Sequence, residues 1–223
     1  MFATVLVAPA SAQAVAECEG QVATIVGTEG DDVLVGTDGP DVIVGLGGDD
    51  RIDGLDGDDV ICGGDGNDTI RAGRGGDRVF GDAGNDRIRG QQSADFIDGG
   101  LGDDNLRGNN GADVIFGADG NDTILGGKGR DLVLGEQGDD DLGGGNHDDL
   151  VSGGDGDDVV RGGNGSDLLD AGRGSNSIRG GIGVDDIFTS CVADDEINSG
   201  DGADMINDGL ETQLAPGDYG CAE

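Results

Sequence analysis

Aspartate recurs at every ninth residue over most of the chain. From Gly27 to Phe188 the sequence reads as eighteen consecutive nine-residue units without an insertion or deletion, for example GGDGNDTIR at 63–71 and GADGNDTIL at 117–125. The sixth position is Asp in seventeen units, and Asn176 is the exception. Calcium prefers carboxylate and carbonyl oxygens. A regular row of carboxylates beside flexible glycine backbone therefore indicates sites for a hard cation.

Turn formation is the competing explanation, because Asp and Gly both favour turns. The third and fifth positions vary widely, however, and include Pro40, Arg74, Lys128 and Arg130, whereas the sixth keeps its carboxylate. We therefore predict that these carboxylates bind metal. The predicted ligands are Asp32, Asp41, Asp50, Asp59, Asp68, Asp77, Asp86, Asp95, Asp104, Asp113, Asp122, Asp131, Asp140, Asp149, Asp158, Asp167, Asp185 and Asp204.

Glycine fills the first and fourth positions of most units. Ala72 and Ala171 replace it at the first position, and Ser93 and His147 replace it at the fourth. Glycine permits tight bends that can turn backbone carbonyls toward a cation. The glycines predicted to do so include Gly27, Gly30, Gly36, Gly39, Gly45, Gly48, Gly54, Gly57, Gly63, Gly66, Gly117, Gly120, Gly153 and Gly156.

The eighth position is Ile, Leu or Val in all eighteen units and predicts the core. One inward aliphatic side chain per unit cannot form a core alone, so the units must stack. We predict an all-β parallel β-roll, in which two nonapeptides make one coil and the strands form two parallel sheets. The predicted rod contains about nine or ten coils at ~4.8 Å spacing.

The ends of the repeat are also visible in the sequence. We predict an N-terminal cap strand within residues 15–26, with Ile25 in the apolar position. After Phe188 the period slips by one residue, and two degenerate repeats follow in 189–207 through Asp195–Ile197 and Asp204–Ile206. Residues 208–223 are predicted to form a C-terminal cap, because solenoid ends need a cover.

These units resemble the GGxGxDxUx repeats of the RTX, or haemolysin-type, calcium-binding family. The resemblance covers about four-fifths of the chain, and it implies a right-handed β-solenoid. It also implies that each Ca²⁺ lies between loops of successive coils, bound by the sixth-position Asp of both loops and by carbonyls of positions one to four.

Carried onto this sequence, the resemblance implies two rows of ligands, one at each edge. Eighteen units give sixteen pairs, and the pair of Asp158 with Asn176 lacks one carboxylate. The remaining fifteen Ca²⁺ would supply +30 against the formal charge of −36. One row is Asp32, Asp50, Asp68, Asp86, Asp104, Asp122, Asp140, Asp158 and Asn176; the other is Asp41, Asp59, Asp77, Asp95, Asp113, Asp131, Asp149, Asp167 and Asp185.

The excess of acidic residues indicates which kinds of partner the protein can bind. With 48 acidic and 12 basic residues, the chain should repel nucleic acid and anionic membranes, and its natural partners are calcium ions. Self-repulsion and the thin core predict that the metal-free chain is largely disordered and that folding is coupled to calcium. No run reaches the roughly 18 apolar residues of a membrane-spanning helix. A protein or glycan partner is not indicated by the sequence.

Catalysis is not expected. The sequence contains no HExxH, GxSxG or P-loop motif, and its single histidine, His147, occupies a glycine position. A structural or adhesive module at the cell surface remains an alternative function. A polysaccharide-active solenoid is a weaker alternative, because the chain has one Tyr and one Lys for a substrate groove.

Residues 1–14 are uncharged and end in two A-x-A patterns, which predicts a signal peptide and a secreted protein. Its basic segment is missing, which suggests a start upstream of Met1. Four cysteines in an exported chain favour disulfides. We expect Cys191 with Cys221 near the end of the repeat and Cys18 with Cys62 near its start, although sequence alone allows three pairings.

Overall fold

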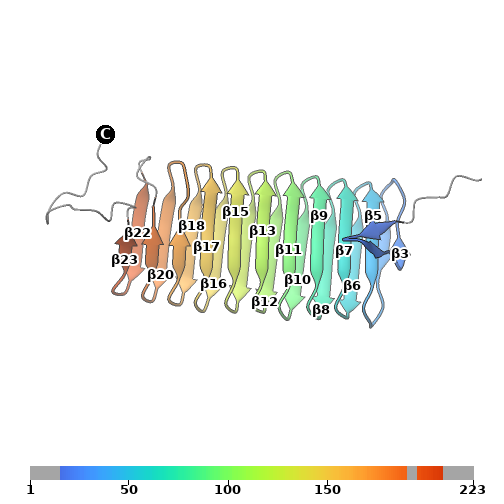
Figure 1. The fold of residues 1–223 in the computed structure, drawn as a ribbon, viewed down its shortest axis with the longest axis horizontal. Helices are drawn as coiled ribbons and strands as arrows, with labels where there is room; N and C mark the ends of the chain where they lie inside the picture. Colours follow the sequence, from blue (N-terminus) through green and yellow to red (C-terminus); the bar gives the residue numbers. More distant parts are fainter. Residues whose placement is uncertain (1–15, 190–194, 208–223) are drawn as a thin grey trace, which may run out of the picture.

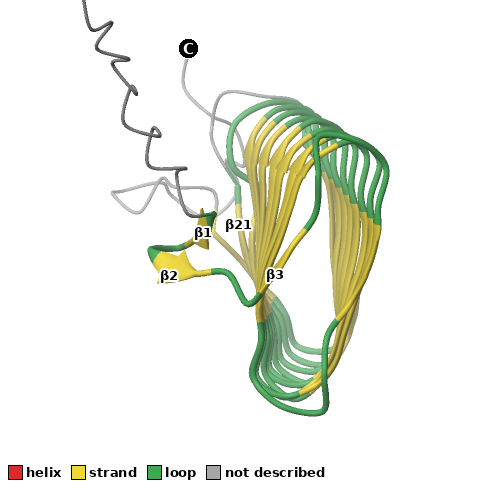
Figure 2. Cartoon of the chain, turned by 90° about the vertical axis from the view of Figure 1, so that its right-hand side faces the viewer, coloured by secondary structure: helices red, strands yellow, loops and turns green. Residues whose placement is uncertain are grey.

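The computed structural model describes residues 16–189 and 195–207. The predicted signal peptide, the C-terminal cap, Cys191 and Cys221 lie outside the described residues. The described chain contains strands and turns, stacked along one axis into a rod (Figure 1). Viewed along the rod, two layers of strands are joined by turns at both edges (Figure 2). The structure confirms the predicted all-β parallel solenoid.

Successive strands alternate between two parallel sheets, which we call the even sheet and the odd sheet after their strand numbers. The even sheet has 10 strands and the odd sheet has 11. The even sheet contains β4 (Val33–Val35), β6 (Arg51–Asp56), β8 (Thr69–Arg74), β10 (Arg87–Gln92), β12 (Asn105–Asn110), β14 (Thr123–Lys128), β16 (Asp141–Asn146), β18 (Val159–Asn164), β20 (Ser177–Ile182) and β22 (Glu196–Asp201). The odd sheet contains β3 (Ile25–Val26), β5 (Val42–Gly47), β7 (Val60–Asp65), β9 (Arg78–Ala83), β11 (Phe96–Leu101), β13 (Val114–Asp119), β15 (Leu132–Gln137), β17 (Leu150–Asp155), β19 (Leu168–Asp170), β21 (Asp186–Phe188) and β23 (Met205–Asn207).

The strand register follows the repeat. Ile88 of β10 pairs with Ile70 of β8 on one side and with Leu106 of β12 on the other, an interval of 18 residues each way. Two nonapeptides therefore form one coil, as predicted. At the end of the repeat Ile178 pairs with Ile197, an interval of 19 residues. The one-residue slip after Phe188 thus falls between β21 and β22, and the strands stay in register.

The core is one narrow layer of aliphatic side chains between the two sheets, to which each sheet contributes one row. All eighteen eighth-position residues, from Leu34 to Ile187, belong to one buried cluster, together with Ala72 and Ala171. Ile25 and Ile197 pack against its two ends. Full burial of one such side chain stabilises the fold by roughly 1.5–3 kcal/mol. Because each coil contributes only two of them, hydrophobic burial per coil is small.

The N-terminal segment differs from the single cap strand expected within residues 15–26. It forms a short antiparallel hairpin, β1 (Glu17–Cys18) with β2 (Gln21–Val22), before β3 joins the odd sheet. Cys18 is buried against Val44 and Val60 on the outer face of that sheet. A disulfide joins Cys18 to Cys62, with their Cα atoms 5.8 Å apart. The hairpin is therefore attached to the first coils both by packing and covalently.

Candidate metal centre

The turns between the sheets place the predicted ligands in two rows. Each regular turn consists of positions four to six of a unit, as in Gly102, Asp103 and Asp104 between β11 and β12. Turns leading from the odd to the even sheet form one edge, and those leading back form the other (Figure 2). The two rows of aspartates therefore follow the assignment made from the sequence, one at each edge.

Glycine is favoured where neighbouring turns approach one another closely. Gly102 has a φ of 118°, and a β-carbon added to it would overlap the carbonyl oxygen of Gly84 in the preceding coil. A side chain there would collide with backbone, and positive φ favours glycine. Ser93 and His147 occupy the same position with φ of 76° and 83°. Turn carbonyls thus point from one coil to the next.

Each regular aspartate is linked to the preceding coil. The backbone N–H of Asp86 donates to Oδ1 of Asp104 at 2.7 Å, and the backbone N–H of Asp104 donates to Oδ1 of Asp122 at 2.7 Å. The same bond recurs along both edges, from Asp32 at one end to Asp204 at the other. One carboxylate oxygen of each residue therefore fixes the side chain inside the turn.

The second carboxylate oxygen has no protein partner. The Oδ2 atoms concerned are buried and accept no hydrogen bond, although a buried carboxylate oxygen without a donor or cation is costly. The row is therefore positioned to bind positive charge. These oxygens belong to Asp50, Asp59, Asp68, Asp77, Asp86, Asp95, Asp104, Asp113, Asp122, Asp131, Asp140, Asp149, Asp158, Asp167, Asp185 and Asp195.

The electrostatics of the turns agree with this geometry. Burial raises the pKa of Asp86 from its ordinary value of 3.8 to about 8, against the lowering effect of the backbone hydrogen bond from Asp68. The neighbouring carboxylates of Asp104 and Asp68 raise it further. Burial likewise raises the pKa of Asp95 to about 8. A bound cation would reverse the effect by stabilising the charged form.

The donor set fits calcium. Among the residues that the structure describes, no three carboxylate, thiolate or imidazole side chains lie together as a metal-binding cluster. A cation at the orphaned Oδ2 atoms would therefore take most of its ligands from turn carbonyls. Such an all-oxygen set suits Ca²⁺ rather than Zn²⁺. His147 belongs to no such cluster, and its Nδ1 lies 2.6 Å from the carbonyl oxygen of Asn146.

Two predicted ligands differ from the others. Oδ2 of Asp32 accepts hydrogen bonds from the backbone N–H and the hydroxyl of Thr28, at 2.6 and 2.8 Å. Oδ2 of Asp41 accepts the equivalent pair from Thr37, at 2.6 and 2.9 Å. In these first two turns the Oδ2 atom therefore has threonine donors, whereas the corresponding Oδ2 atoms of the later turns have no partner.

The C-terminal end of each row also departs from the simple pattern. Oδ1 of Asn176 accepts the bond from Asp158 at 2.8 Å, so the amide keeps the link between coils but brings no charge. Asp195 was not among the predicted ligands, yet its Oδ2 is buried without a partner. The Asp195–Ile197 spacing in the degenerate repeat is the signal that could have identified it. Asp204, which was predicted, is only half-buried.

A parallel solenoid whose turns carry buried, partly unpaired carboxylates at a nine-residue period defines a calcium-binding repeat protein. The profile of the RTX calcium-binding nonapeptide repeat matches residues 26–61, 35–70, 63–97, 71–106, 107–142, 143–178 and 161–190. The chain belongs to this family. No curated protein sequence matches the chain. The described residues contain no helix that is long and apolar enough to cross a membrane.

Proposed function

We propose that this protein is exported and that its solenoid folds when rows of Ca²⁺ fill the turns. The unpartnered Oδ2 atoms carry the proposal, because each is a buried carboxylate oxygen that no donor of the described residues satisfies and that a cation would satisfy. Extracellular calcium modules bind with dissociation constants of about 10⁻⁴–10⁻³ M. The chain would then stay unfolded where calcium is scarce and fold after export.

The proposed number of ions comes from pairing the sixth-position aspartates of successive coils in the sequence. About fifteen Ca²⁺ would supply +30 and nearly cancel the formal charge of −36. Export is supported by the A-x-A patterns at Ala10–Ala12 and Ala12–Ala14. N-terminal sequencing of protein from a secreting host would test this, since a mature chain that still carries residues 1–14 would contradict cleavage.

The decisive experiment is a far-ultraviolet circular dichroism titration of the mature chain with CaCl₂, with MgCl₂ as the control. A cooperative rise in β-sheet signal with calcium alone, reversed by excess chelator, is expected. A chain already folded in chelator would contradict coupled folding. We propose a binding and structural role without catalysis, because the side chains that recur from unit to unit are turn carboxylates and core aliphatics.

A further inference from the structure

Arginines gather on the outer face of the even sheet. Arg71, Arg89 and Arg107 lie side by side on β8, β10 and β12, in register on neighbouring strands. Arg87 lies across from Thr69 on the same face. The chain has only 12 basic residues, so this is a marked concentration of positive charge. The strand spacing of ~4.8 Å sets the distance between neighbouring arginine backbones.

Within the part of the chain that the structure describes, no ion pair neutralises these arginines. Five ion pairs connect arginines to acidic side chains in the described residues, and they involve Arg74, Arg78, Arg130, Arg161 and Arg173. None of the arginines lining the cluster takes part in them. The positive charge of Arg87 lowers the pKa of Arg89, and Arg107 and Arg71 add to the effect. Like charges are thus held together although the chain has 48 acidic residues.

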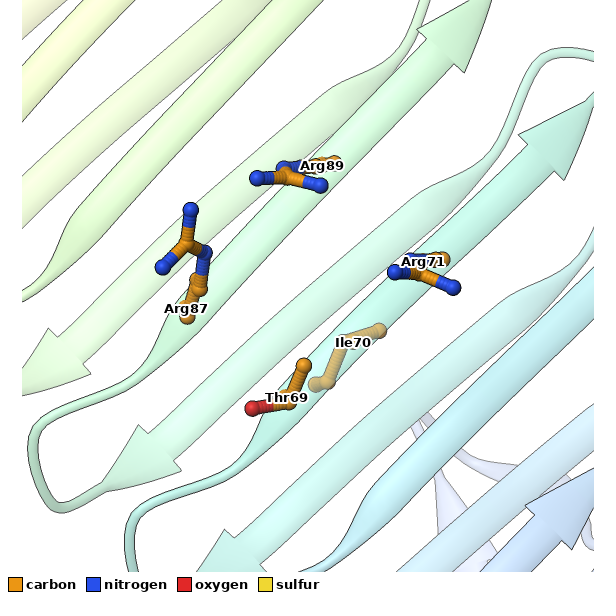
Figure 3. A pocket seen from close by; sticks show the side chains of 5 residues that line it. All are labelled: Thr69, Ile70, Arg71, Arg87 and Arg89. Atoms are coloured by element: carbon orange, nitrogen blue, oxygen red, sulfur yellow. The ribbon is translucent and has the colours of Figure 1, made fainter.

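The side chains surround a shallow hollow. Thr69 and Arg71 from β8 and Arg87 and Arg89 from β10 line a space of about 350 Å³. Figure 3 shows the three guanidinium groups and the threonine side chain standing on adjacent strands around it. The intervening Ile70 is fully buried in the core, so the outward side chains belong to one face. The hollow lies on the outer face of the strands, and two of its residues, Thr69 and Arg87, directly follow the turn aspartates Asp68 and Asp86.

The number of donors indicates the ligand. A carboxylate has two oxygens, and a single guanidinium fork can satisfy both. Three guanidinium groups and one hydroxyl suit an anion with more oxygens and a higher charge, and a phosphate group carries about −1.5 to −2 at neutral pH. We propose that Arg71, Arg87, Arg89 and Thr69 form a binding site for the phosphate group of a phosphate ester, either a soluble ester or a lipid headgroup.

The test uses the calcium-loaded full chain and glucose 6-phosphate in isothermal titration calorimetry. The variant carries Arg71→Gln, Arg87→Gln and Arg89→Gln. The matched control carries Arg74→Gln, Arg130→Gln and Arg173→Gln, which remove the same charge from arginines already paired at the turns. The wild type and the control should bind alike, and the variant should bind at least about tenfold more weakly. Circular dichroism of each protein with calcium shows whether it is folded.

Two further arms identify the source of the phosphate. Co-sedimentation with phosphatidylglycerol vesicles that is lost in the Arg71/Arg87/Arg89 variant would assign the group to a lipid, whereas binding of glucose 6-phosphate alone would assign it to a soluble ester. Equal binding of glucuronate would overturn the proposal in favour of an acidic sugar. Binding that survives in the folded variant, or no binding of glucose 6-phosphate or vesicles by the wild type, would also overturn it.

Discussion

The side chain of Asp104 is tied to the backbone of Asp86 in the preceding coil by a hydrogen bond of 2.7 Å to its Oδ1 atom. Its Oδ2 atom is buried without a partner. The two oxygens of this carboxylate therefore have different roles. The hydrogen bond to Oδ1 orients the side chain, and Oδ2 is available to bind a cation. Asparagine would keep the first property and lose the second, as Asn176 does naturally.

The first prediction concerns Asp104→Asn. The variant should bind about one or two fewer Ca²⁺, because each aspartate adjoins the gaps on both sides of its coil, and should need more calcium to fold. Calcium stoichiometry by equilibrium dialysis and the circular dichroism midpoint measure these effects. Asp103→Asn is the matched control, since Asp103 is the exposed neighbour in the same turn. An Asp104→Asn variant with unchanged stoichiometry and midpoint would contradict metal binding at this row.

The second prediction separates the first turns from the rest. Oδ2 of Asp32 is satisfied by Thr28, so Asp32→Asn should change calcium stoichiometry less than Asp104→Asn does. Thr28→Gly removes the hydroxyl donor and should make the turn more like its successors, with an unchanged or increased number of ions. Equal loss of calcium in Asp32→Asn and Asp104→Asn would show that the threonine does not replace the ion.

The third prediction concerns pH in the absence of calcium. Burial raises the pKa of Asp86 and Asp95 from 3.8 to about 8, so the folded chain holds more protons than the unfolded chain between these values. The metal-free solenoid should therefore gain stability as pH falls through this range and lose it as pH rises. With calcium bound the direction reverses, because protons compete with the metal for the carboxylates.

A calcium-depleted sample checks this sign. Without calcium, circular dichroism should show more β structure at pH 5 than at pH 7.5. In a calcium titration, the calcium concentration at the folding midpoint should instead be higher at pH 5 than at pH 7.5, because protons compete with the metal. Metal-free protein that unfolds further on acidification would contradict the burial of these carboxylates.

The repeat made most of the fold predictable. A single aliphatic residue such as Ile88 per unit forces stacking, and a fixed period of nine then determines that it pairs with Ile70 and Leu106. The hairpin β1–β2 was not predicted, because its segment lies outside the repeat and is held by packing on the odd sheet. The role of Thr28 was missed since the second position varies freely, and only the folded turn places its hydroxyl against Asp32. The arginine cluster has a sequence signal that was not used, namely the 18-residue spacing of Arg71, Arg89 and Arg107.

The last prediction concerns the disulfide between Cys18 and Cys62, which closes a segment of 44 residues. A loop of this length stabilises a fold by roughly 4 kcal/mol through the unfolded chain. Cys18→Ser with Cys62→Ser should lower the unfolding temperature of the calcium-loaded protein and make Val44 and Val60 accessible beneath the hairpin. The disulfide and its hydrophobic cluster lie on the outer face of the odd sheet near the start of the solenoid, so calcium stoichiometry should stay the same. Differential scanning calorimetry and equilibrium dialysis measure the two effects, and Cys191→Ser with Cys221→Ser is the matched control. Loss of most bound calcium in the Cys18/Cys62 variant would show instead that the disulfide is needed for the whole solenoid to form.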